Sequence, residues 1–216
     1  MKLIKSSLFS LLLLGVTVLS AQEANLVIPM GHAQRVNYIE TSFDFKLLGS
    51  VDDSNIIHIW DTESQREIYQ LNAHSAGIVN LDFHPTKNEM VSSDQDGNIY
   101  IWDTSNFTVI KTIETGDKRA LVKYLPDGSA LIAGGKEKLS VYESSTWSET
   151  KSIEMPSSVT SMAYSLFLET LFVGTQSGEL RGYKIEGMEM VYTLQDRDQS
   201  INAIAAFDDK AAIVLG

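Results

Sequence analysis

Histidine is the residue type of this chain best suited to acid–base chemistry or metal binding, and the sequence holds four. No two of them have the H-x-H or H-E-x-x-H spacing that brings two imidazoles to one ion. His58 lies between Ile57 and Ile59 in an alternating run, so it faces away from both on a predicted strand. We expect His58 to be a hydrogen-bonded or exposed strand histidine, and we expect no metal and no cofactor.

Other residues with catalytic potential also lack the spacing that catalysis needs. The absence of cysteine excludes disulfides, thiolate metal sites and thiol nucleophiles. No G-x-S-x-G motif marks a nucleophilic serine, and AGGKEKLS (133–140) lacks the ending of a phosphate-binding loop. Asp52-Asp53 and Asp208-Asp209 fall in predicted turns without a calcium-loop pattern, where solvated charges are expected. We therefore expect this chain not to be an enzyme.

A repeat of about 42 residues organises the elements that carry these side chains. Trp60 and Trp102 are 42 residues apart, and each is followed by Asp-Thr. His32 and His74 have the same separation, and each precedes its tryptophan by 28 residues. The period continues with two tyrosines at the ends of later alternating runs, Tyr142 and Tyr183.

Each period contains four short runs rich in Ile, Val, Tyr and Phe that are separated by turn residues. Asp96-Gly97 is a strong hairpin signal between two of these runs. No helical period is sustained beyond the N-terminal apolar segment, so an all-β fold is predicted. In the second period the predicted strands are 77–83, 89–93, 98–102 and 108–114.

Two dipeptides recur at fixed places in the first two periods: Gly-His at 31–32 with Ala-His at 73–74, and Trp-Asp at 60–61 and 102–103. With these motifs the chain resembles the WD40-repeat family, in an exported bacterial form. The resemblance implies a β-propeller of four-stranded blades, here an incomplete ring of about 4.5 blades. The predicted parts are a closing strand (25–29), four blades (about 32–72, 74–114, 117–155 and 157–195) and a partial blade (200–216).

The resemblance also implies a hydrogen-bonded network of Trp, Ser or Thr, His and Asp inside a blade. In the second blade His74, Ser92 (or Ser93), Asp96 and Trp102 fit these roles. In the first blade His32 and Trp60 fit, but Ser54 stands at the expected aspartate position, so a looser network is predicted there. The third and fourth blades have no such histidine and are expected to rely on packing alone.

WD40 propellers bind other proteins with turns on one face, so the predicted function is that of a non-enzymatic protein-interaction scaffold. Alignment to the second blade predicts a rim that binds a protein or peptide partner. Its predicted residues are Arg35, Asn37, Gln95, Lys118 and Arg119, with Ser158 and Thr160 at equivalent positions. The basic members are expected to meet carboxylates of that partner, since the chain is otherwise acidic.

Residues 1–21 have the pattern of a signal peptide: Lys2 and Lys5, an apolar run at 8–19, and small residues before Gln22. We therefore expect export, to the periplasm, the cell surface or the medium, without a membrane anchor after cleavage. Loss of the two lysines changes the net charge from −11 to −13. Such an acidic chain is not expected to bind nucleic acid.

Residues 200–216 supply only two strands of a fifth blade, which favours an N-terminal part of a longer protein. An alternative function follows from that reading: a propeller module of a larger enzyme, for example a caspase-like peptidase, whose catalytic domain lies beyond residue 216. A propeller enzyme that acts on a small molecule in its channel is a third possibility, but the blades show no convergent catalytic residues.

Overall fold

The computed structural model describes residues 31–195, 199–206 and 213–215. Within these ranges the chain forms strands and no helix, which confirms the predicted all-β fold. No helix in the described part is long and apolar enough to cross a membrane. The predicted signal peptide (1–21) and closing strand (25–29) lie outside the described residues.

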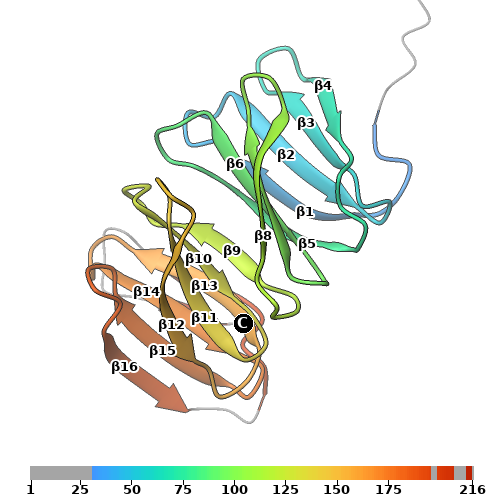
Figure 1. Cartoon of the computed structure of the whole chain (residues 1–216). Coiled ribbons are helices and arrows are strands. Elements are labelled where there is room, and N and C mark those ends of the chain that lie inside the picture. Colours follow the sequence, from blue (N-terminus) through green and yellow to red (C-terminus); the bar gives the residue numbers. More distant parts are fainter. Residues whose placement is uncertain (1–30, 196–198, 207–212, 216) are drawn as a thin grey trace, which may run out of the picture. The chain divides into compact units, whose positions relative to one another are not determined.

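The strands form four four-stranded antiparallel sheets and one two-stranded sheet, each built from strands consecutive in sequence (Figure 1). The first sheet contains β1 (Val36–Thr41), β2 (Leu47–Asp52), β3 (Ile57–Asp61) and β4 (Arg66–Leu71). The second contains β5 (Ile78–Phe83), β6 (Glu89–Asp94), β7 (Asn98–Asp103) and β8 (Thr108–Glu114). The third contains β9 (Leu121–Tyr124), β10 (Ala130–Gly134), β11 (Lys138–Glu143) and β12 (Glu149–Glu154). The fourth contains β13 (Val159–Ser165), β14 (Thr170–Thr175), β15 (Glu179–Lys184) and β16 (Met190–Gln195), and the small sheet pairs β17 (Ile204–Ala206) with β18 (Ile213–Leu215).

These sheets are the blades expected from the 42-residue repeat, and we refer to them as the first to fourth blades. The hairpin predicted at Asp96-Gly97 joins β6 to β7, and Gly97 there has a φ of +87°. A side chain at this position would also collide with the neighbouring blade, because a Cβ would lie 2.3 Å from the carbonyl oxygen of Asp117. Glycine is therefore required by both conformation and space.

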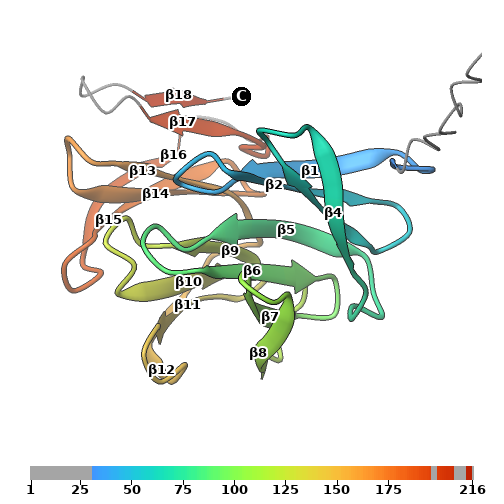
Figure 2. The same ribbon diagram turned by 90° about the horizontal axis from the view of Figure 1, so that it is seen from above.

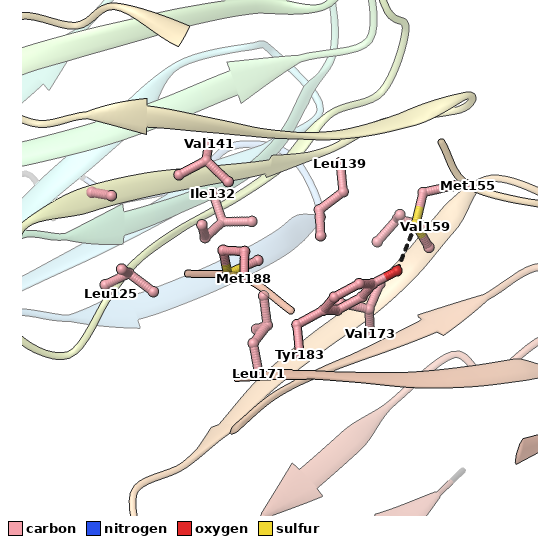
Figure 3. Packing of buried hydrophobic residues seen from close by; sticks show 11 residues of the cluster. Leu125, Ile132, Leu139, Val141, Met155, Val159, Leu171, Val173, Tyr183 and Met188 are labelled. Atoms are coloured by element: carbon pink, nitrogen blue, oxygen red, sulfur yellow. Dashed lines mark hydrogen bonds between the residues drawn. The ribbon is translucent and has the colours of Figure 1, made fainter. Parts of the chain in front are cut away.

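Apolar side chains of neighbouring blades form a separate core at each junction. Between the third and fourth blades, Ile132 and Leu139 belong to one buried cluster with Leu171 and Val173, and all four are 0% exposed (Figure 3). The outermost strands of the blades, such as β8 and β16, are mostly exposed. Hydrophobic burial thus joins each blade to the next, since an isolated blade could not cover its own faces.

The first strands of the second and third blades, β5 and β9, lie side by side (Figure 2), and polar side chains of β5 join them. Asn80 of β5 donates to the carbonyl of Val122 on β9 at 2.8 Å and accepts from its N–H at 2.9 Å. Asp82 accepts the N–H of Tyr124 at 2.6 Å. These side chains pair with the backbone much as another strand would, and they satisfy peptide groups that burial would otherwise leave without partners.

Candidate functional site

The second blade contains a buried polar network at the turn between β6 and β7. His74 Nδ1 lies 3.0 Å from Asp94 Oδ2, and its Nε2 lies 2.7 Å from Ser92 Oγ. Trp102 donates its indole N–H to the same Ser92 oxygen at 2.8 Å. The structure therefore brings together three of the four residues that the sequence predicted here, His74, Ser92 and Trp102.

The fourth predicted residue, Asp96, does not take part, and Asp94 holds its place. Asp96 is exposed in the turn and donates its backbone N–H to Asp94 Oδ1 at 3.0 Å. Side chains alternate along a strand, so Ser92 and Asp94 share one face of β6, whereas Ser93 faces the opposite way and bonds Asn80. The network aspartate thus lies at the end of the strand and not within the turn.

Electrostatics in this network favour a neutral imidazole beside an ionised carboxylate. Burial lowers the pKa of His74, although the hydrogen bond to Asp94 opposes that effect. Burial alone would raise the pKa of Asp94, but hydrogen bonds from His74 and from the N–H of Asn98 outweigh it and lower the pKa. A neutral histidine can donate from Nδ1 and accept at Nε2, which is what the network requires.

The first blade has the same network, so the looser arrangement predicted there is corrected. His32 lies 2.8 Å from Asp52 Oδ2 and 2.5 Å from Ser50 Oγ, and Trp60 donates to Ser50 at 2.7 Å. Ser54, at the position where aspartate was expected, donates its backbone N–H to Asp52. Burial would raise the pKa of Asp52, but hydrogen bonds from Ser54 and His32 lower it to about 2.

The third blade supplies the same carboxylate from a different place in the chain. Asp117, in the segment before β9, accepts the backbone N–H groups of Lys136 and Glu137 at 2.9 Å and of Lys138 at 3.2 Å. Gly135, directly after β10, occupies the position that Asp94 has in the second blade. A Cβ at Gly135 would lie 2.2 Å from Asp117 Oδ2. The Asp117 carboxylate therefore fills the space that an aspartate at 135 would use.

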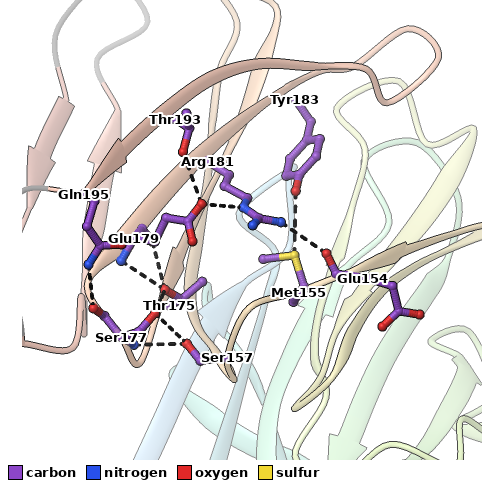
Figure 4. A network of polar contacts seen from close by, with 10 residues as sticks. All are labelled: Glu154, Met155, Ser157, Thr175, Ser177, Glu179, Arg181, Tyr183, Thr193 and Gln195. Carbon is purple, nitrogen blue, oxygen red and sulfur yellow. Dashed lines mark hydrogen bonds and ion pairs between the residues drawn. The ribbon is translucent and has the colours of Figure 1, made fainter.

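The fourth blade also contains a polar network, shown in Figure 4, so its cohesion does not depend on packing alone. Thr175, paired with Val159 as Asp94 is with Ile78, accepts the N–H of Glu179 at 3.1 Å. Tyr183 stands in the register position of the tryptophans, and its hydroxyl lies 3.6 Å from Met155 Sδ. Absence of the histidine thus changes the partners in the network but does not remove it.

A basic hollow of about 530 Å³ lies where turns and first strands of the later blades meet. Its cations are Lys118, Arg119 and Lys136, all exposed, and none of them forms an ion pair within the described part of the chain. The predicted rim residues Ser158 and Thr160 line the same hollow. Lys136 is not among the residues that the sequence predicts for the rim; it lies in the segment 133–140, which lacks the ending of a phosphate-binding loop.

The remaining predicted rim residues lie elsewhere. Arg35 Nη2 lies 3.4 Å from Asp53, and its Nε donates to Asn37 at 3.1 Å, so the charge of Arg35 is already paired within its own blade. Asn37 also donates to Asp53, at 2.6 Å. Gln95 is exposed and does not line the hollow, but its carbonyl accepts the N–H of Arg119 at 3.3 Å.

The residues that line the hollow are mainly basic, polar and aliphatic. The described residues that line it include three cations and polar side chains such as Thr160 and Gln176, but no histidine and no carboxylate. An anionic group held there would meet hydrogen-bond donors, whereas a general base or nucleophile paired with a base is not among the lining residues.

Comparison with known proteins points to one repeat type. Residues 65–103 match the family model described as "WD domain, G-beta repeat". Human Protein NEDD1 is 34% identical over 112 residues, which cover 49% of this chain and 17% of NEDD1. The serine-threonine kinase receptor-associated protein of Gallus gallus is 22% identical over 77% of this chain and 47% of its own length.

A guanine nucleotide-binding protein subunit beta-like protein of Encephalitozoon cuniculi is 23% identical over 86% of this chain and 64% of its own length. The chain therefore spans less than two thirds of each of these relatives. All three organisms are eukaryotes, so these relatives do not bear out the bacterial form suggested by the sequence. The matches support membership of the repeat in the WD40-repeat family.

Proposed function

We propose that this chain, whose blades and sequence matches support the WD40-repeat family, is a non-enzymatic protein-interaction scaffold that captures an acidic segment of a partner. The observation that carries the proposal is the basic hollow formed by Lys118, Arg119 and Lys136. The whole chain has a net charge of −11, so three unpaired cations at one hollow stand out against the rest of its surface.

Electrostatic complementarity explains how such a site would select its partner. Exposed cations attract a segment rich in Asp or Glu and repel basic segments, which raises the association rate and suppresses wrong partners. Screening by salt weakens such contacts, because the Debye length falls from about 10 Å at 0.1 M salt to about 3 Å at 1 M. The polar side chain of Gln176, which also lines the hollow, can then hydrogen-bond the backbone of the bound segment.

The test is binding of a fluorescent Glu-rich peptide, followed by anisotropy at increasing salt. We expect the triple variant Lys118→Ala, Arg119→Ala and Lys136→Ala to weaken binding at least tenfold. A control variant that removes three exposed cations outside the hollow, Arg66, Lys87 and Lys111, should bind as the wild type does. Equal loss in both variants would show that net charge, and not the hollow, governs binding.

We also propose export of the chain, because residues 1–21 have the pattern of a cleaved leader. The measurement is N-terminal sequencing of the protein recovered from a host whose secretion pathway is intact. A mature chain that starts near Gln22 would support export, and an intact Met1 on the recovered protein would count against it.

A further inference from the structure

The first blade contains a second histidine beside its polar network, and this histidine has an unused nitrogen. His58 on β3 is 4% exposed, and its Nε2 has no hydrogen-bond partner. That nitrogen lies 3.4 Å from Asp52 Oδ2, the same oxygen that lies 2.8 Å from His32 Nδ1. The potential ligand atoms of His32, Asp52 and His58 all lie within 4.8 Å of one another.

Glu67 on β4 determines which His58 nitrogen is available. Its Oε1 lies 2.8 Å from His58 Nδ1, and its side chain is 2% exposed. In the neutral ring a carboxylate at Nδ1 holds the proton on that nitrogen, and the lone pair of Nε2 is then directed toward Asp52. A lone pair that faces a carboxylate oxygen in a buried site is unfavourable unless a positive charge lies between them.

Carboxylate, histidine and ion in this order form a known arrangement in metal sites. A ligating histidine donates its second ring N–H to a carboxylate, which orients the ring and makes it a better ligand. In this arrangement Glu67 is the outer carboxylate, and His58 Nε2 is directed toward the position of the ion. The sequence predicts a hydrogen-bonded or exposed His58. The structure shows a hydrogen bond at Nδ1 but none at Nε2.

The second blade provides an internal comparison without this feature. Tyr100 stands opposite Ser92 as His58 stands opposite Ser50, and Val109 stands in the register position of Glu67. Both nitrogens of His74 are engaged by Asp94 and Ser92. The polar network alone thus needs neither a second histidine nor an outer carboxylate, so these two residues have another role in the first blade.

We propose that His32 Nδ1, Asp52 Oδ2 and His58 Nε2 bind one divalent transition-metal ion of the zinc type, with water as a further ligand. Two imidazole nitrogens and one carboxylate oxygen are a donor set that zinc accepts, and zinc–ligand distances near 2.0–2.2 Å fit within such a cluster. When the ion binds at Nδ1, the His32 ring changes tautomer by exchange with solvent: one proton leaves Nδ1 and one is taken up at Nε2, which then donates to Ser50.

The test is a titration of the metal-depleted chain with Zn²⁺ by calorimetry, repeated with Co²⁺ to record its visible absorption. We expect one Zn²⁺ per chain and a Co²⁺ spectrum typical of nitrogen and oxygen ligands. His58→Tyr, which copies the second blade, should weaken binding at least 100-fold. Glu67→Gln should weaken it about 10- to 100-fold, as outer-shell changes do, and Tyr100→Phe is the matched control that should bind as the wild type does.

Two results would overturn the proposal. Equal Zn²⁺ binding by the wild type and His58→Tyr would assign the ion to surface carboxylates. No Zn²⁺ uptake by a wild type that is folded by circular dichroism would show that these three residues hold no ion. If His58→Tyr does not fold, Glu67→Gln decides, because its amide oxygen still accepts from Nδ1 and keeps the ring in place.

Discussion

In each of the two Trp-Asp pairs, the aspartate forms hydrogen bonds in a turn, whereas the tryptophan belongs to the buried network. Trp102 enters the buried network, whereas Asp103 accepts the N–H of Ser105 at 2.8 Å in the turn between β7 and β8. Asp61 accepts the N–H of Ser64 at 2.7 Å in the equivalent turn of the first blade. Neighbouring residues of a strand face opposite sides, so one dipeptide serves both a network and a turn.

Replacement of Asp94 tests which aspartate belongs to the network of the second blade. Asp94→Ala leaves His74 Nδ1 and the N–H of Asn98 without their acceptor, so we expect unfolding free energy to fall by about 2–4 kcal/mol. Asp96→Ala is the matched control and should change it by less than about 0.5 kcal/mol, since Asp96 is exposed. Urea denaturation measures both, and a larger loss for Asp96→Ala would contradict the network described.

Acid should weaken the same network in two steps, and each step lowers the free energy of unfolding. The pKa of His74 is lowered by burial in the folded state, so its contribution is present above about pH 6.5 and is lost as pH falls below that value. The pKa of Asp94 is also lowered in the folded state, so its contribution is lost as pH falls below about 4. Thermal unfolding followed from pH 7.5 to 3 should show a falling Tm in the wild type.

The matched variant for this pH dependence is Asp94→Asn, which removes the titrating group but keeps an amide oxygen near His74. We expect its Tm to fall less than that of the wild type between pH 5 and 3. A wild-type Tm that stays constant over the acidic range would show that neither group changes its protonation on unfolding.

Sequence periodicity locates network residues whose type repeats from blade to blade. It fails where a residue of another type, or from another position, takes the same place in the network. The histidine and tryptophan of the first two blades are found because they repeat at 42 residues. Asp94 was missed because a sequence does not show whether β6 ends before or after it. Asp117 could not be found by alignment, since its carboxylate reaches the turn from a segment that precedes the first strand.

At the scale of elements, the first strands of the second and third blades are joined by β5 side chains that bond the backbone of β9. Asp82 is the costly member of this set, because burial raises its pKa to about 6 while Lys123 and the N–H of Tyr124 offset only part of that effect. A folded-state pKa above the ordinary value means that the group favours folding below about pH 4 and loses that advantage as pH rises through about 6.

Asp82→Asn should therefore stabilise the chain at neutral pH. The amide oxygen still accepts the N–H of Tyr124, and no buried charge remains, so we expect a gain of about 1–3 kcal/mol at pH 7.5. The gain should vanish near pH 3.5, where both states are protonated. Asp127→Asn in an exposed turn is the control, and urea midpoints at the two pH values would show whether the gain depends on pH as stated.

At the scale of the molecule, contacts between strands join each blade to the next one in the chain. Stability should then depend mainly on neighbouring junctions. Leu171→Ala opens a cavity in the core between the third and fourth blades, and losses of about 2–5 kcal/mol are typical of such changes. Hydrogen exchange should show reduced protection in β9–β16, with β1–β4 near the wild-type level; uniform loss over all sheets would contradict this view.

The four blades could be predicted from the sequence because the strand pattern and the period continue in the third and fourth blades, where the histidine and tryptophan of the motif are absent. The family model matches residues 65–103, and four complete sheets are present in the described part of the chain. Of the basic residues predicted for the rim, Lys118 and Arg119 line the hollow, whereas Arg35 is paired with Asp53. Pairing of surface charges depends on side-chain positions, which a period does not specify.

The polar links between first strands have a consequence for synthesis of the protein on the ribosome. Asn80 and Asp82 each bond a residue 42 positions later, which equals the length of the repeat. This junction can therefore close as soon as one more first strand has left the exit tunnel, because the loop that it closes is one repeat long. The chain can then fold blade by blade during translation, which limits how long unpaired strand edges stay exposed to other nascent chains.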